Sequence, residues 1–140
     1  MYKSFGIHVK VKNIEKSYTF YKKLGFREIF AYGKKSFLTK LEKKTPKVDE
    51  KYNGVTFQLG DTKFEIADGH LAVKPETFKK KILSSKISAM IFVESVEDIL
   101  KICKKNSIKV SVPIKEYHWG TKELVLKDPD GFVLVFIENI

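Results

Sequence analysis

The last third of the chain repeats the pattern of its first third, and this repeat limits the folds open to the sequence. When residues 6–26 are shifted by 82 positions onto 88–108, the apolar positions of the two segments coincide. The aligned pairs include Val11 with Val93, Ile14 with Val96, Tyr21 with Cys103 and Phe26 with Ile108. A sheet with a single helix leaves an apolar face that a second copy helps to cover. We therefore expect two modules, each a strand, a helix and further strands.

The length of 140 residues suits one domain that buries its own core. We expect a single domain over 1–140, with modules at about 4–68 and 87–140 and a connector at 69–86. No apolar run reaches the roughly 18 residues of a membrane span, and the N-terminus lacks a signal-peptide pattern. Cys103 is the only cysteine, which excludes an internal disulfide and favours a small buried side chain. These features predict a cytoplasmic protein.

The net charge of +10 raises the question of nucleic-acid binding. Arg27 is the only arginine, however, and the lysines are dispersed rather than gathered with exposed aromatic residues. Proteins that bind the bases and phosphates of nucleic acids rely on the forked guanidinium of arginine and on clustered positive charges. We therefore expect a solvated lysine-rich surface and no nucleic-acid or membrane partner.

The first module opens with alternating residues over 4–12, which is typical of a half-buried strand. Ile7, Val9 and Val11 share one face and Gly6, His8 and Lys10 the other. Asn13 is a good helix N-cap and Gly25 a good stop, so 14–24 is predicted to be a helix on the Ile7 face. His8 and Lys10 should then face whatever the sheet encloses.

The rest of the first module reads as short strands. We expect strands at 26–32, 54–59 and 62–67, the last two joined by the tight turn at Gly60 and Asp61. Residues 36–41 are a candidate hairpin partner for 26–32, and 42–53 is polar enough to be an exposed loop. The connector is predicted to hold one or two helical turns at 77–83. On the strand 62–67, Lys63, Glu65 and Ala67 share a face.

The second module repeats this order. We expect strands at 87–93, 108–113, 121–127 and 132–137 and a helix at about 96–106, with a tight turn at 128–131. Met90 and Phe92 point away from the helix, as does Val135 on the last strand. The loop 115–120 carries Tyr117, His118 and Trp119. It is predicted to form the rim of a cavity, to pack on the sheet edge or to make a dimer contact.

These residues resemble the vicinal oxygen chelate superfamily, which includes glyoxalase I, the bleomycin-resistance proteins and the extradiol dioxygenases. The matching segments are 11–17 with 20–26, and 119–123 with the Asp-Pro-Asp-Gly-Phe run at 128–132. The resemblance covers nearly the whole chain. It implies an α+β fold of two βαβββ modules that form a curled, half-open mixed β-sheet with helices on the outer face, often paired in a homodimer.

The resemblance also implies where the metal enzymes of the superfamily hold a divalent ion. Carried over to this chain, those positions are Gly6, Glu65, Ser88 and Val135. Only Glu65 offers a usual ligand, whereas a catalytic ion needs about three protein ligands with oxygen or nitrogen donors. We therefore expect no metal and no other cofactor. His8 lies near enough in the pattern to pair with Glu65 in a relocated metal site or as an acid–base pair. His70 and His118 fall in loops and do not complete such a site.

The sequence thus predicts a homodimer that binds a small amphiphilic or aromatic molecule in its concave cavity. The expected ligand-binding residues share a predicted inward face or rim: His8, Lys10, Glu65, Met90, Phe92, Trp119 and Val135. A concave apolar surface with a few polar groups is the usual construction of such a site. Strongly cationic drugs such as bleomycin fit a +10 protein poorly. The alternative is a metal-dependent lyase, isomerase or dioxygenase of glyoxalase type. Whether the modules pair within one chain or between two remains open.

Overall fold

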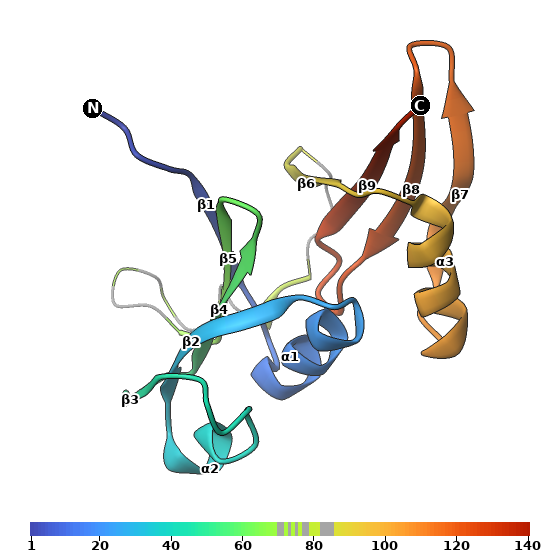
Figure 1. Ribbon diagram of the computed structural model, residues 1–140. Coiled ribbons are helices and arrows are strands. Elements are labelled where there is room, and N and C mark those ends of the chain that lie inside the picture. The colour runs from blue at the N-terminus through green and yellow to red at the C-terminus, as the bar shows by residue number, and fades with distance from the viewer. Residues whose placement is uncertain (70–71, 73, 75, 77–78, 82–85) are drawn as a thin grey trace. The chain divides into compact units, whose positions relative to one another are not determined.

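The computed structural model describes the chain except for residues 70–71, 73, 75, 77–78 and 82–85 (Figure 1). Its contacts divide the chain into two compact units, Met1–Lys80 and Lys81–Ile140. The boundary falls inside the predicted connector, and the helical turns expected at 77–83 lie mostly outside the described residues. Each unit contains one copy of the predicted repeat, blue to green in the first and yellow to red in the second.

The first unit is a five-stranded mixed sheet covered on one face by a helix. Its strands are β1 (Gly6–Lys10), β2 (Arg27–Gly33), β3 (Lys47–Asp49), β4 (Gly54–Leu59) and β5 (Thr62–Ala67), in the spatial order β1-β5-β4-β2-β3. β1 runs parallel to β5, as β2 does to β3, and the other pairs are antiparallel. The first and last strands of the repeat are therefore neighbours.

Helix α1 (Ile14–Lys23) begins where the sequence predicts and ends one residue earlier, with Leu24 as its C-cap. The Asn13 side chain accepts a hydrogen bond from the Lys16 N–H, and Gly25 has a positive φ of 88°. The helix packs Tyr21 on an aromatic cluster below the sheet, with ring centroids 5.0, 6.0 and 4.9 Å from those of Phe26, Phe57 and Phe64. Because all four rings are buried, this face is the core of the unit.

Two predictions for the middle of this unit are wrong. Residues 36–41 do not form a hairpin strand, because α2 (Lys35–Leu38) makes one helical turn that buries the adjacent Phe37 and Leu38. A strand would point these two neighbours to opposite faces. The polar segment 42–53 is not all loop, since β3 adds an edge strand beside β2.

The second unit repeats the arrangement with four strands. They are β6 (Ser88–Phe92), β7 (Val110–Tyr117), β8 (Thr121–Lys127) and β9 (Val133–Asn139), in the order β6-β9-β8-β7, with α3 (Val96–Lys105) packed against β7, β8 and β9. β6 is parallel to β9, just as β1 is to β5. Leu124, Leu126 and Leu134 are buried in its core. The prediction of two βαβββ modules with open mixed sheets is thus confirmed.

Strand β7 is longer than predicted and includes Tyr117, which we had placed in a loop. Pro113 lies within it, although proline cannot donate a ladder hydrogen bond. The strand tolerates proline because it is at the sheet edge and its register with β8 shifts between Val112 and Lys115. Cys103 is buried in α3, and burial raises the pKa of its thiol, as expected for a structural cysteine. Among the described residues, no helix is long and apolar enough to cross a membrane.

Candidate functional site

The polar residues of the first unit gather on the sheet face opposite α1. In the parallel register of β1 and β5, His8 lies beside Glu65 and Gly6 beside Lys63. β4 adds Thr56 next to Glu65 on the other side. Neighbouring residues on paired strands point to the same face, so this register brings the side chains of three strands together.

The carboxylate of Glu65 is the centre of this group. His8 Nε2 lies 3.0 Å from Glu65 Oε2, and the Tyr32 hydroxyl donates to the same oxygen at 2.8 Å. The Thr56 hydroxyl donates to Oε1 at 3.1 Å. Because a carboxylate only accepts, His8 Nε2 carries the hydrogen of its contact. Three protein donors therefore fix the orientation of Glu65, whose side chain is 29% exposed.

Two hollows meet at this carboxylate. One, of about 380 Å³, is lined by Gly6, Ile7, His8, Ile29, Phe30, Thr56, Lys63 and Glu65. The other, of about 320 Å³, is lined by His8, Tyr32, Val48, Glu50, Tyr52 and Glu65. His8 and Glu65 belong to both. The first hollow combines an apolar wall with charged groups, which is the pattern of a small-molecule site.

A β-bulge decides which side chains of β2 reach the open face. The register of β2 and β4 shifts between Glu28 and Phe30. Glu28 is buried and bonded to α1, whereas Tyr32, four residues later, reaches Glu65 on the opposite face. Strict alternation would have put these two residues on one face. The bulge thus supplies both Phe30 and Tyr32 to the hollows.

Gly54 makes room for the Tyr32 ring. A Cβ atom at this position of β4 would lie 2.2 Å from Tyr32 Cζ and 2.3 Å from its hydroxyl oxygen. Tyr52 meets the same ring edge to face, with centroids 6.0 Å apart and planes at 87°. The phenol is therefore held between a glycine and a second aromatic ring, and aimed at Glu65.

The electrostatic environment shifts two groups on this face. Burial, and next the hydrogen bond to Glu65, raise the pKa of Tyr32. Burial lowers the pKa of Lys10, an effect that the negative charge of Glu65 opposes. Tyr32 therefore stays a protonated donor at neutral pH, and the Lys10 charge lies within the field of the carboxylate.

We expect part of the tyrosine population to ionise late in a spectrophotometric titration. The pKa values of Tyr18 and Tyr32 are both raised, first by burial and then by hydrogen bonds to Glu28 and Glu65. Phenolate absorbance should stay incomplete well above about pH 10, where free tyrosine titrates. Tyr18→Phe and Tyr32→Phe should each remove part of the late amplitude. Full amplitude at that pH in the folded protein would contradict the two contacts.

The same shifts predict a loss of stability at high pH. A pKa that folding raises gives stability that is complete below the unfolded value of about 10 and declines as pH rises above it. Urea midpoints should therefore fall above pH 10. They should fall less in the Tyr32→Phe variant, which has lost one of the two raised groups.

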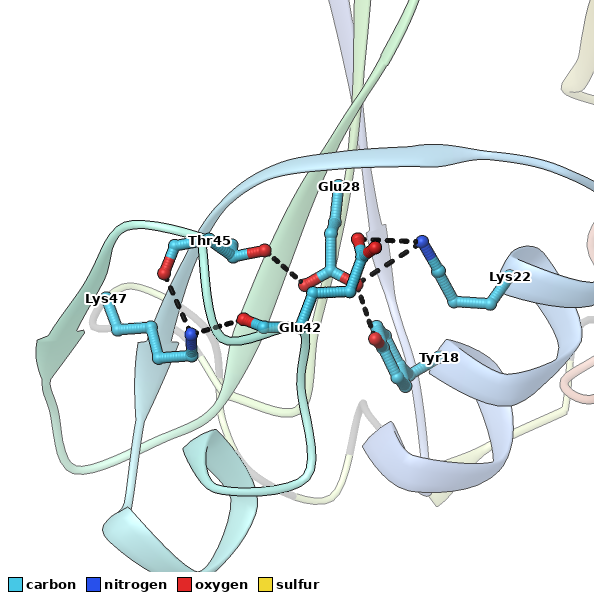
Figure 2. A network of polar contacts seen from close by, with 6 residues as sticks. All are labelled: Tyr18, Lys22, Glu28, Glu42, Thr45 and Lys47. Carbon is cyan, nitrogen blue, oxygen red and sulfur yellow. Dashed lines mark hydrogen bonds and ion pairs between the residues drawn. The ribbon is translucent and has the colours of Figure 1, made fainter.

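A buried polar network holds the segment that carries β3 (Figure 2). Glu28 accepts from the hydroxyls of Tyr18 and Thr45, the latter at 2.8 Å, and lies 3.4 Å from Lys22 Nζ. Lys22 also donates to Glu42 at 3.1 Å, which lowers the pKa of the Glu42 carboxyl. The network therefore ties α1 and β2 to residues 42–45. Val48 and Glu50, which follow directly, line the second hollow.

Lys47 closes this segment on itself. Its Nζ donates to the carbonyl oxygens of Glu42, Thr45 and Lys43, at 2.6, 2.8 and 3.4 Å. The first two of these bonds are drawn in Figure 2. A lysine that satisfies three carbonyls of a loop compensates for the missing ladder hydrogen bonds there. The Glu28 network and the Lys47 bonds thus both hold the segment that leads into β3.

The predicted residues of the second unit lie on the open face of its sheet or on a hairpin tip. Met90 and Phe92 are 64% and 62% exposed, and Met90 pairs with the half-buried Val135. Trp119, 60% exposed, stacks on Tyr117 at a centroid distance of 4.5 Å, and its Nε1 donates to Thr121. The predicted faces are correct. Met90, Phe92, Val135 and Trp119 remain predicted ligand contacts.

Comparison with known proteins identifies the family. The sequence profile of the Glyoxalase/Bleomycin resistance protein/Dioxygenase superfamily matches residues 7–136. The chain belongs to this superfamily. No curated protein matches the sequence. The resemblance inferred from the repeat and its motifs is therefore confirmed.

Solved structures show the same fold at low identity. A superfamily member from Sphaerobacter thermophilus has a TM-score of 0.65 at 17% identity, over 99% of this chain and 98% of the other. A bleomycin-binding protein complexed with bleomycin has 0.59 at 18%, over 100% and 99%. The fosfomycin resistance protein FosX from Listeria monocytogenes, complexed with Mn(II) and sulfate, has 0.61 at 12%, over 100% and 93%.

The residues at the superfamily's metal positions do not fit an ion. Of Gly6, Glu65, Ser88 and Val135, only Glu65 has a usual ligand side chain, and both of its oxygens already accept protein hydrogen bonds. Among the described residues, no group of three or more His, Cys, Asp or Glu side chains is arranged so that it could hold a metal ion. His118 contacts Trp119 instead, with centroids 5.0 Å apart, and His70 lies outside the described residues. A catalytic ion needs about three ligands, so we derive no metal chemistry for this chain.

Sequence reasoning placed His8, Lys10 and Glu65 on this face, as the structure does, but did not single out Tyr32 and Thr56. Thr56 could have been predicted from the sequence, because the hairpin at Gly60 fixes the register of β4 and β5 and so pairs Thr56 with Glu65. Tyr32 gave no such signal, since the bulge in β2 changes the face on which it lies. Both residues bind the same carboxylate.

Proposed function

We propose that this protein binds a small amphiphilic or aromatic molecule on the open face of its first sheet, without a metal ion. The observation that carries the proposal is the state of Glu65. Its two oxygens are occupied by His8, Tyr32 and Thr56, so the carboxylate is oriented by protein groups and not left for a cation. Beside it, Ile29 and Phe30 give the 380 Å³ hollow an apolar wall.

The fold relatives support a binding role. One of the similar structures is a bleomycin-binding protein in complex with its drug, so this fold is able to hold a small molecule. At 18% identity that likeness extends to the fold and not to the ligand. The homodimer and the cytoplasmic location predicted from the sequence are parts of the same proposal.

A thermal-shift screen of aromatic and amphiphilic small molecules, run with and without EDTA, tests this function. We expect ligands that raise the melting temperature equally in both buffers. Glu65→Gln should weaken a ligand found in this way by about tenfold, because an amide cannot accept with both of its polar atoms from His8, Tyr32 and Thr56, and these groups of the hollow lose their fixed geometry. Glu97→Gln is the matched control, since Glu97 lies on α3 and pairs with Lys122.

The decisive contrary result concerns metal content. If protein purified without chelator or affinity tag holds about one divalent ion per chain, and Glu65→Ala loses it, the metal-free proposal is wrong. The glyoxalase-type lyase, isomerase or dioxygenase would then become the leading function.

One observation favours a second candidate, a metal-independent acid–base activity. His8 Nε2 and Glu65 Oε2 are within hydrogen-bond reach at 3.0 Å, and the Tyr32 phenol stands beside them as a proton donor. The His8 side chain is 33% exposed at the mouth of both hollows, so a bound molecule would reach it. Turnover that is lost in His8→Gln while ligand affinity is kept would favour catalysis over binding alone.

A further inference from the structure

The charged groups around the first hollow differ in whether they have hydrogen-bond partners within the protein. Both oxygens of its carboxylate, Glu65, already accept from close protein donors, as described above. Lys63 lines the same hollow, yet among the described residues its Nζ makes no hydrogen bond or ion pair. Lys10 adds a second positive charge on this face. The group still able to bind a partner there is therefore a cation.

Lys63 stands where a ligand can reach it. It is two residues before Glu65 on β5, on the same face, and pairs with Gly6 of β1. A Cβ atom at position 6 would lie 3.5 Å from Lys63 Cβ and 3.1 Å from its carbonyl oxygen. Because glycine has no side chain, the space next to the lysine stem stays open. Gly6 is one of the positions to which the resemblance assigns a metal ligand, and in this chain it leaves open space beside Lys63.

The two hollows differ in charge. Glu65 lines both. The second hollow adds the carboxylate of Glu50 and two tyrosine rings, whereas the first adds Lys63 and the apolar pair Ile29 and Phe30. The second hollow therefore carries two negative charges, and an anion should prefer the first, where the Lys63 charge offsets that of Glu65. The net charge of +10 also raises the local concentration of anions around the protein.

We propose that the ligand of the first hollow is an amphiphilic monocarboxylate, whose carboxylate binds Lys63 Nζ and whose apolar part packs on Ile29 and Phe30. This inference rests on the proposed binding function and specifies its ligand class. Lys63 is the specificity-determining residue. Glu65 stays bonded to His8, Tyr32 and Thr56 and does not compete for the lysine.

Three probes of the same shape and different charge test the inference. They are 2-naphthoate, 2-naphthamide and 2-naphthylmethylammonium, titrated by calorimetry at low ionic strength and again in 0.5 M NaCl. We expect naphthoate to bind about threefold to fivefold more tightly than the amide, which is the upper part of the range for one exposed ion pair. The ammonium probe should bind most weakly, and added salt should reduce the differences.

Variants locate the effect. In Lys63→Gln, most of the preference for naphthoate over naphthamide should disappear, because the ion pair with the lysine is lost while Lys10 and the overall positive charge remain. Lys101→Gln is the control of equal charge change, since Lys101 is exposed on α3 in the second unit. It should keep the preference. Lys63 is exposed at the surface of β5, so its replacement should not disturb folding.

The outcomes separate this inference from the function on which it rests. If the three probes bind alike, or if the ammonium probe binds best, the carboxylate class is wrong while small-molecule binding stands. A preference for naphthoate that is as large in Lys63→Gln as in the unchanged protein overturns the role of Lys63. If no probe binds and the wider thermal-shift screen also finds no ligand, the proposed function fails, and the carboxylate class with it.

Discussion

Replacing Glu28 with alanine is expected to lower the free energy of unfolding by about 3 kcal/mol. The Glu28 side chain is fully buried and accepts from Tyr18 and Thr45, with Lys22 Nζ 3.4 Å away. Alanine would leave the Tyr18 and Thr45 hydroxyls without this acceptor, and Lys22, which is partly exposed, would keep only Glu42 as a charged partner. Removing one partner of a buried charged network is far more costly than the net value of the network itself.

Urea unfolding followed by far-ultraviolet circular dichroism measures this loss. Glu15→Ala is the control, because Glu15 makes a single exposed ion pair with Lys40 and should cost less than about 1 kcal/mol. Trp119, the only tryptophan, lies in the second unit, so its fluorescence reports that unit separately. Similar small losses in both variants would show that the network adds little.

The same variant should also loosen the wall of the second hollow. Residues 42–45 are bonded to the Glu28 network, and β3 follows them directly. Hydrogen exchange of the amides of β3 should therefore accelerate in Glu28→Ala, while those of β1 and β5 keep their protection. Unchanged exchange in β3 would show that the Lys47 bonds alone fix this segment.

The sequence predicts the parts of the fold that depend on local periodicity. The alternation in β1 separates Val9 from His8 and Lys10, and the structure buries Val9 and leaves the other two on the open face. Asn13 and Gly25 mark the ends of α1 because each acts on the backbone within a few residues. The repeat carries the same inference to the second unit.

What the sequence does not predict depends on departures from regular periods. The bulge in β2 adds one residue and sends Glu28 and Tyr32 to opposite faces, and no local signal marks its position. The helical turn α2 and the edge strand β3 form because Phe37 and Leu38 find a buried site and Lys47 satisfies loop carbonyls. Both are consequences of tertiary packing.

The candidate site likewise contains residues that regular strand patterns predict and residues that they do not. The alternation of β1 and β5 allows His8 to approach Glu65, and in the structure His8 Nε2 lies 3.0 Å from Glu65 Oε2. Tyr32 completes the group only through the bulge and through the space that Gly54 leaves. From the sequence alone, Gly54 read simply as the start of a strand. Its role becomes visible when the ring of Tyr32 is seen to occupy the place of its missing side chain.

Gly54→Ala is accordingly expected to destabilise the fold by about 2 kcal/mol, within the range for overpacking a filled site. The new Cβ atom would lie 2.2 Å from Tyr32 Cζ, so the ring must leave its position. Displacement breaks the 2.8 Å hydrogen bond to Glu65. The variant should therefore also lose the part of the late phenolate titration that belongs to Tyr32, together with affinity for any ligand that depends on the Glu65 group.

A double-mutant cycle with Tyr32→Ala separates this clash from a general effect on β4. In the Tyr32→Ala background the ring is gone, and Gly54→Ala should then cost less than about 0.5 kcal/mol, the level of sites that do not interact. An equal cost in both backgrounds would mean that β4 itself rejects a side chain at this position. The binding face would then depend on the backbone of β4 and not on the seat of one tyrosine. A large coupling energy would instead make Gly54 and Tyr32 one structural unit, in which a glycine of the core strand sets the geometry of the carboxylate at the proposed site.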